Sequence, residues 1–144
     1  METSLQTCKN ILLENHSLTC VVQKGETLLR SEARGIAPLL GWLEADHNAL
    51  RGAVIADKVI GKAAAMLMVY GGAAQVYASV ISEPAATCFT ENGIVYFCDQ
   101  TVDYIVNRSG DGMCPMEQCC LTIDSPAEAY TALKQKLAQL KSQS

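Results

Sequence analysis

Hydrophobic positions along the chain switch between two spacings, and this pattern predicts alternating helices and strands. In some segments apolar residues recur every three or four positions, whereas in others they alternate with polar residues or form short runs. The predicted helices cover residues 3–14, 36–45, 61–70, 84–93, a segment from 115 onwards and 126–140. The predicted strands cover residues 18–23, 26–31, a segment beginning at 53, 75–81 and 94–98. The pattern leaves the state of 102–106 open and predicts a loop over 107–112.

The central part of the chain, residues 52–88, predicts the core of an α/β fold. The strand that begins at Ala53 is apolar on both faces, and the helix over 61–70 has no polar face, so other elements must cover both. A hairpin over 18–31 precedes this unit, and right-handed crossovers are expected between its later strands. We therefore predict a single domain over 1–144, folded as a three-layer α/β/α sandwich with a mixed sheet.

Composition and charge argue against several classes of function. The net charge is −4 and the basic residues form no run, so we expect no nucleic-acid partner. No apolar run is long enough to span a bilayer and the N-terminus does not resemble a signal peptide, so we expect a cytoplasmic protein without a membrane partner. The 7 cysteines are scattered and the 2 histidines are isolated, which predicts no disulfide, no metal and no cofactor.

One motif resembles part of the site of zinc deaminases, which share the cytidine-deaminase-like fold. In those enzymes a strand runs into Glu-Pro-Cys-x-x-Cys at a helix start, and the preceding helix begins with His-x-Glu or Cys-x-Glu. Here a strand runs into EPAATC, so Ala85 stands where the first cysteine ligand should be. The preceding helix begins with GKAA at Gly61 and offers neither the imidazole nor the carboxylate. We therefore predict that the chain is not a zinc deaminase.

Several separated runs also resemble domain-of-unknown-function family 1893. These runs are DKVIGKAAA, VISEPA, CPME and SPAEAYTALKQKL, in that order. The resemblance covers residues 17–137 approximately. It implies a zinc-less, cytidine-deaminase-like fold in a bacterial or archaeal protein, without an assigned activity.

Lys62 is the first candidate for a functional side chain, because it lies directly after Gly61 at the predicted start of a buried helix. The positive end of the helix dipole and burial both lower the pKa of a lysine at this position. A neutral amine there can act as a base or nucleophile, and a charged one can hold an anion at the helix start with Gly61. A lysine whose ammonium reaches solvent is the alternative.

Three further candidates lie near the carboxyl ends of predicted strands, where α/β proteins usually bind ligands. Asp57 and Lys58 lie at the end of the first buried strand, and Glu83 lies at the same edge, one strand over. We expect Asp57 and Lys58 to contact a ligand and Glu83 to act as an acid or to bind a substrate amine. The alternatives are that Asp57 caps a helix and that Glu83 is a first-turn carboxylate favoured by the helix dipole.

The last candidates surround the predicted helix that follows the 107–112 loop. Cys114 occupies its cap position, which lowers the pKa of a thiol and makes Cys114 a candidate nucleophile, although no histidine is placed beside it. Glu117, three residues later, opposes that shift and is a candidate ligand-binding residue. Arg108 in the loop can hold an anion, or can simply be solvated.

These residues predict a pocket at the carboxyl ends of the central strands that binds a small anionic or nucleotide-like metabolite. Whether Lys62 or Cys114 also carries a metal-independent reaction stays open. The alternative is a non-catalytic regulatory or protein-interaction module, for example a homodimer, as a fold alone does not fix a function.

Overall fold

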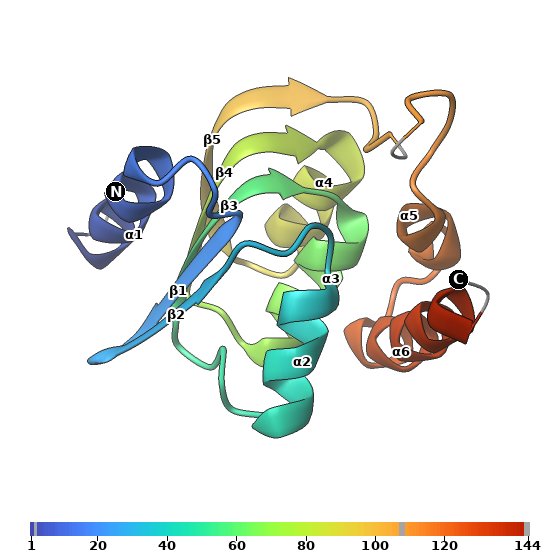
Figure 1. The fold of residues 1–144 in the computed structure, drawn as a ribbon, viewed down its shortest axis with the longest axis horizontal. Coiled ribbons are helices and arrows are strands. Elements are labelled where there is room, and N and C mark those ends of the chain that lie inside the picture. The colour runs from blue at the N-terminus through green and yellow to red at the C-terminus, as the bar shows by residue number, and fades with distance from the viewer. Residues whose placement is uncertain (2, 107–108, 143–144) are drawn as a thin grey trace.

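The computed structural model describes Met1, residues 3–106 and residues 109–142. It contains one five-stranded sheet with the strand order β2-β1-β3-β4-β5 (Figure 1). The strands are β1 (Cys20–Lys24), β2 (Thr27–Ser31), β3 (Val54–Ile60), β4 (Gln75–Ser82) and β5 (Val95–Val102). The helices are α1 (Thr3–Glu14), α2 (Ala37–Ala45), α3 (Lys62–Gly71), α4 (Glu83–Glu91), α5 (Pro115–Cys120) and α6 (Pro126–Ser142). The predicted α/β class with a mixed sheet is confirmed.

The sheet joins an antiparallel hairpin to three parallel strands. β1 pairs antiparallel with both β2 and β3, while β3, β4 and β5 are parallel to one another. Since α3 follows β3 directly and α4 follows β4 directly, both helices begin at the carboxyl-end edge of the parallel strands. The N–H groups of the two helix starts therefore lie at the same edge of the sheet, where ligands bind in many α/β proteins.

Helices cover the two faces of the sheet unequally. Figure 1 shows α1 alone on one side and α2 to α6 on the other. Successive side chains of β4 alternate between the two sides, since Val76 and Ala78 join the cluster around α3 whereas Tyr77 joins the cluster under α1. The central strands are thus buried on both faces, as their continuous apolar runs predict.

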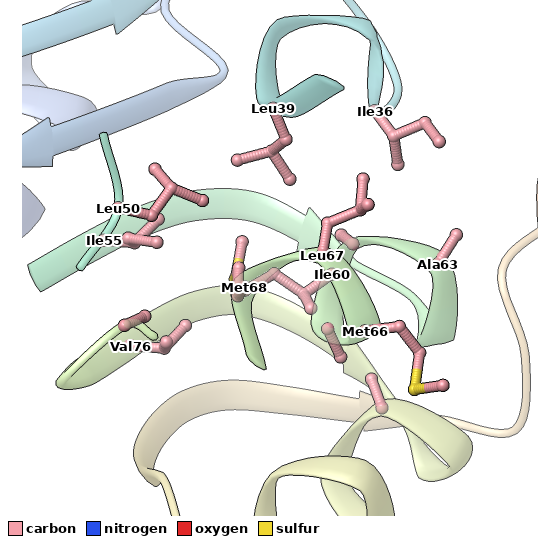
Figure 2. Close-up of a cluster of buried hydrophobic side chains, with 14 of the residues drawn as sticks. Ile36, Leu39, Leu50, Ile55, Ile60, Ala63, Met66, Leu67, Met68 and Val76 are labelled. Carbon is pink, nitrogen blue, oxygen red and sulfur yellow. The ribbon is translucent and has the colours of Figure 1, made fainter. Parts of the chain in front are cut away.

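The larger hydrophobic cluster is built around α3. Figure 2 shows Leu67 and Met68 of this helix among side chains from α2, β3 and β4. Most of α3 is buried, because β3, α2, α4, α5 and α6 all contact it. This explains why the segment has no polar face. The C-cap of the helix is Gly72, whose φ of 82° lies in the left-handed region that favours glycine.

Two strand boundaries differ from the sequence expectation. β5 continues to Val102, beyond the predicted end at Cys98, since Gln100, Thr101 and Val102 still pair with β4. β3 continues through Asp57 and Lys58 to Ile60, so these two residues lie within the strand and not at its end. In the described residues, no helix combines the length and the hydropathy that crossing a membrane requires.

Candidate functional site

The start of α3 is closed by a carboxylate from a distant part of the chain. Glu117 of α5 accepts a hydrogen bond at Oε1 from the backbone N–H of Lys62, at 2.6 Å, and at Oε2 from that of Ala63, at 2.7 Å. Only 7% of Glu117 is exposed. The helix-start N–H groups, which the sequence suggested as an anion site, are therefore bound by a carboxylate of the chain itself.

Gly61 leaves the room that this carboxylate occupies. Gly61 is the N-cap of α3, with φ −98° and ψ −178°, an extended conformation open to any residue. A Cβ at this position would lie 2.1 Å from Glu117 Oε1. Glycine is thus needed here for close approach and not for backbone freedom. Gly61, rather than Asp57, occupies the cap position of this helix.

A Gly61→Ala substitution is therefore expected to displace the Glu117 carboxylate and to destabilise the fold by about 1–3 kcal/mol, the usual cost of overpacking. Urea denaturation measures the change. In a Glu117→Ala background the same glycine substitution is expected to cost much less, because the oxygen that clashes with the new Cβ is gone. Equal costs in the two backgrounds would show that the clash is not with Glu117.

The Lys62 side chain makes a second contact between α3 and α5. Its Nζ donates a hydrogen bond to the backbone oxygen of Leu121, at 2.9 Å. Leu121 is the C-cap residue of α5, where a free carbonyl and the negative end of the helix favour a cation. We refer to the contacts among Gly61, Lys62, Ala63, Glu117 and Leu121 as the α3–α5 junction.

Burial is the dominant influence on the Glu117 carboxyl group. It raises the pKa of Glu117 above its usual value, while the hydrogen bonds from Ala63 and Lys62 and the Lys62 charge act in the opposite direction. The two backbone hydrogen bonds satisfy the oxygens that burial removes from water. Glu117 is thus a structural partner of α3.

A groove of about 450 Å³ lies beside this junction, along α4. Residues of α3 and α4 and of the segments after β5 and α5 form its walls. Among the described residues, those lining it are Lys62, Met66, Glu83, Pro84, Thr87, Cys88, Glu91, Asn92, Asp103, Leu121 and Asp124. Its walls are both polar and apolar, and its size suits a small metabolite.

Carboxylates dominate the charge of the groove. Glu83, Glu91, Asp103 and Asp124 line it, whereas Lys62 is its one lining cation among the described residues. Glu83 begins α4, but the side chain that caps this helix is Ser82, whose Oγ accepts from the Ala85 N–H at 3.2 Å. The described residues contain no group of three or more side chains that could hold a metal ion. The groove therefore has the acceptors and the charge to receive N–H donors of a ligand.

Cys88 is the thiol in the groove wall. Its Sγ lies 3.4 Å from Met66 Sδ, and burial raises its pKa to about 11 while the nearby Lys62 opposes the rise. At neutral pH Cys88 is therefore a protonated, weakly nucleophilic thiol. A covalent reaction through this sulfur is disfavoured.

Comparisons with known proteins identify the family. The sequence profile of a domain of unknown function (DUF1893) matches residues 8–137. The chain belongs to the DUF1893 family. A crystal structure of a DUF1893 family protein from Thermotoga maritima (TM1506) is similar over 94% of this chain and 92% of that chain, with a TM-score of 0.84 and 27% sequence identity. No curated protein matches the chain significantly. The family resemblance is thus confirmed, and it assigns no activity.

The structure brings only some of the predicted site residues of this DUF1893 protein together. Lys62 and Glu83 line the groove, and Gly61 and Glu117 form the junction beside it. Arg108 lies outside the described residues.

The other three predicted residues do not line the groove. Asp57 is buried in β3 opposite Cys20 of β1. Lys58 Nζ donates to the backbone oxygen of His16, at 2.6 Å, so its ammonium contacts the segment between α1 and β1. Cys114 is the N-cap of α5, and its N–H donates to the Ile105 oxygen at 2.9 Å.

Several groove residues of this DUF1893 protein were not among the predicted ones. Glu91 and Asn92 lie at the end of α4, and Asp103 and Asp124 follow β5 and α5. In the sequence they read as ordinary polar residues near helix and strand ends, so no local signal distinguishes them. Cys88 did carry a signal, because it ends the EPAATC run that resembles the deaminase motif.

Proposed function

We propose that this DUF1893 protein binds a small metabolite of nucleoside size, bearing amine or amide N–H donors, in the groove along α4. The observation that carries the proposal is the charge of the groove, where four carboxylates face one ammonium group. Carboxylate oxygens accept hydrogen bonds from exocyclic amines and ring N–H groups, and they repel phosphates. The groove therefore favours the nucleotide-like ligand of the sequence prediction in its unphosphorylated form.

The α3–α5 junction also favours an unphosphorylated ligand over a phosphorylated one. An anionic ligand would be expected at the N–H groups of Lys62 and Ala63, but Glu117 accepts from both. A free phosphate would have to displace a buried carboxylate that makes two short hydrogen bonds. A ligand in the groove can instead contact the exposed carboxylates without opening the junction.

The fold supports a nucleoside-like ligand by analogy. We propose that the α/β fold is a zinc-less form of the three-layer, cytidine-deaminase-like sandwich, since helices cover both faces of the sheet. In the motif comparison Ala85 stands where a deaminase has its first cysteine ligand, the start of α3 offers no histidine, and Cys88 lies in the wall of the groove. The proposed ligand would thus occupy the region where a deaminase holds its base.

We propose binding without catalysis as the activity of this site, in the cytoplasm. Lys62 is engaged with the Leu121 oxygen, and Cys88 is a protonated thiol at neutral pH, so neither is prepared to attack a substrate. The 7 cysteines, all within the described residues, are free, which suits a reducing compartment. The proposal combines two sequence predictions: a pocket that binds a small metabolite, and the alternative that the protein is a non-catalytic regulatory module.

Isothermal titration calorimetry with cytidine, adenosine and their monophosphates tests the proposal. We expect at least one nucleoside to bind about tenfold or more tightly than its monophosphate, because the groove carries excess negative charge. Glu83→Gln combined with Glu91→Gln is expected to weaken nucleoside binding. Glu26→Gln combined with Glu32→Gln, which removes two exposed charges in the β1–β2 hairpin, is the matched control.

Two outcomes would overturn the proposal. Tighter binding of the monophosphates, abolished by Lys62→Ala, would restore the anion site that the sequence suggested. Absence of binding by all four ligands would remove nucleosides from the proposed ligand class.

A further inference from the structure

The outer edge of β5 is unpaired in the described residues. β5 is eight residues long and pairs only with β4, at the end of the sheet opposite β2. In Figure 1 it is the outermost strand, beyond β4. Every second residue of such a strand directs its backbone N–H and C=O away from the sheet, where another strand can bind them.

The two edges of the sheet differ in their protection against such pairing. β2 has five residues, and charged Lys24, Glu26, Arg30 and Glu32 lie on or beside it. β5 has no lysine, arginine, proline or glycine, and Val95, Tyr96, Phe97, Thr101 and Val102 favour a strand. Natural edge strands usually carry charges or prolines that prevent association. β5 lacks these features, so its sequence permits pairing with a further strand.

The single charged side chain of β5 is turned toward its own sheet. Asp99 Oδ2 accepts a hydrogen bond of 2.5 Å from the Tyr77 hydroxyl of β4. Lys9 of α1 lies over the Tyr77 ring, with its Nζ 4.7 Å from the ring centre, which adds a positive charge on that side. The carboxylate is thus held on the sheet face and does not obstruct the edge.

We propose that β5 pairs antiparallel with β5 of a second copy of this chain. The two copies are related by a two-fold axis that passes midway between their Cys98 residues. A two-fold axis perpendicular to the sheet places the same strand of two copies antiparallel to each other. Opposed side chains lie on the same face of the sheet, so one residue must lie opposite its own copy at the axis. Centring on Asp99 would oppose two carboxylates, which is unfavourable. Centring on Cys98 opposes Val95 to Thr101 and Phe97 to Asp99, and it pairs nearly the whole strand.

This register has a chemical consequence. The two Cys98 residues lie directly opposite each other, with the Cα separation of about 4.5–5.5 Å found for opposed residues in antiparallel pairs. Such a separation permits a disulfide. Cys98 is free and is the exposed cysteine of the chain, since the other six are buried or half-buried.

Sedimentation equilibrium of the full chain under reducing conditions tests the dimer. We expect a monomer–dimer equilibrium at micromolar to submillimolar concentration. Added diamide, which takes up the two hydrogens of the two thiols, is expected to give a disulfide-linked dimer through Cys98 that Cys98→Ser abolishes. Cys98→Lys, which opposes two ammonium groups in the pair, is expected to raise the dissociation constant about tenfold or more. Thr27→Lys places the same charge at an exposed position of β2, the other edge strand, and is expected to leave the dissociation constant unchanged.

A chain that stays monomeric throughout this concentration range would overturn the proposal. So would a dimer that Cys98→Lys leaves intact, or one that Thr27→Lys dissociates instead. Far-UV circular dichroism of each variant verifies the fold, and the oxidative cross-link of the unmodified chain tests the register even if a lysine variant fails to fold.

Discussion

Glu117→Ala is expected to lower the free energy of unfolding by about 2–5 kcal/mol, because a buried polar group left without its partner costs about 1–3 kcal/mol and two such groups are affected. The substitution leaves the N–H groups of Lys62 and Ala63 without their acceptor at a helix start where Ala63 is fully buried. It also leaves a cavity between α3 and α5. Urea denaturation of the two proteins, followed by circular dichroism, measures the difference.

Glu128→Ala is the matched control for this result. Glu128 occupies the same position of α6 that Glu117 occupies in α5, in the first turn two residues after a proline, but it is exposed. We expect the control to cost a small fraction of the Glu117→Ala effect. If both substitutions cost the same, Glu117 contributes only as an ordinary first-turn carboxylate, and the junction does not hold the start of α3.

Asp57→Asn is expected to remove a large pH dependence from the stability of the protein. Asp57 lies in the middle of the sheet beside Cys20, and burial raises its pKa to about 7, against weaker opposing effects of hydrogen bonds from Val59, Cys20 and Lys58. Because the folded pKa is higher than the unfolded one, the stabilising contribution is fully present below pH 4 approximately and is lost as the pH rises through about 7. The neutral asparagine cannot lose a proton.

The measurement is urea denaturation of the original protein and of Asp57→Asn at pH values from 4.5 to 8. Relative to the original protein, Asp57→Asn should gain on the order of 2–4 kcal/mol across this interval, at 1.36 kcal/mol for each pKa unit. Glu26→Gln, at an exposed turn, should show no such gain. Parallel curves for Asp57→Asn and the original protein would mean that Asp57 ionises in the folded state as it does in the unfolded chain.

Much of the fold follows from local sequence patterns. The β3–α3–β4–α4 unit was predictable because its strands are continuous apolar runs and Gly61 and Pro84 mark the starts of its helices. The second half of β5 was not, because residues 98–101 of this edge strand are exposed, and the polar residues there do not distinguish a strand from a loop. The single-domain prediction for residues 1–144 stays a prediction.

The candidate site was only partly predictable, for a physical reason. Lys62 and Glu83 begin helices that follow neighbouring parallel strands, so the topology brings them to one edge. The partner of the α3 start is Glu117, 55 residues from Lys62 in the sequence, and no periodicity reports a contact over that distance. The one local sign was Gly61, a cap residue without a side chain, which requires that another group satisfy the helix start.

The contacts of the α3–α5 junction explain why a lysine lies at a buried helix start. The sequence suggested that Lys62 holds a negative ligand, acts as a base or nucleophile, or extends its ammonium into solvent. In the structure the carboxylate of Glu117 and the carbonyl of Leu121 meet the backbone and the ammonium of this residue. The charge at the helix start is thus balanced within the chain, and the adjoining groove keeps its carboxylates for a ligand of the opposite kind.

The most direct test of this account is an NMR titration of the uniformly ¹⁵N-labelled protein with inorganic phosphate and, separately, with cytidine or adenosine. Phosphate is expected to leave the amide signals of Lys62 and Ala63 in place, since Glu117 already accepts from both. A nucleoside is expected to shift the amide signals of Glu83, Asn92 and Asp103 along the groove. Saturable shifts of Lys62 and Ala63 with phosphate, together with an unresponsive groove, would contradict this account.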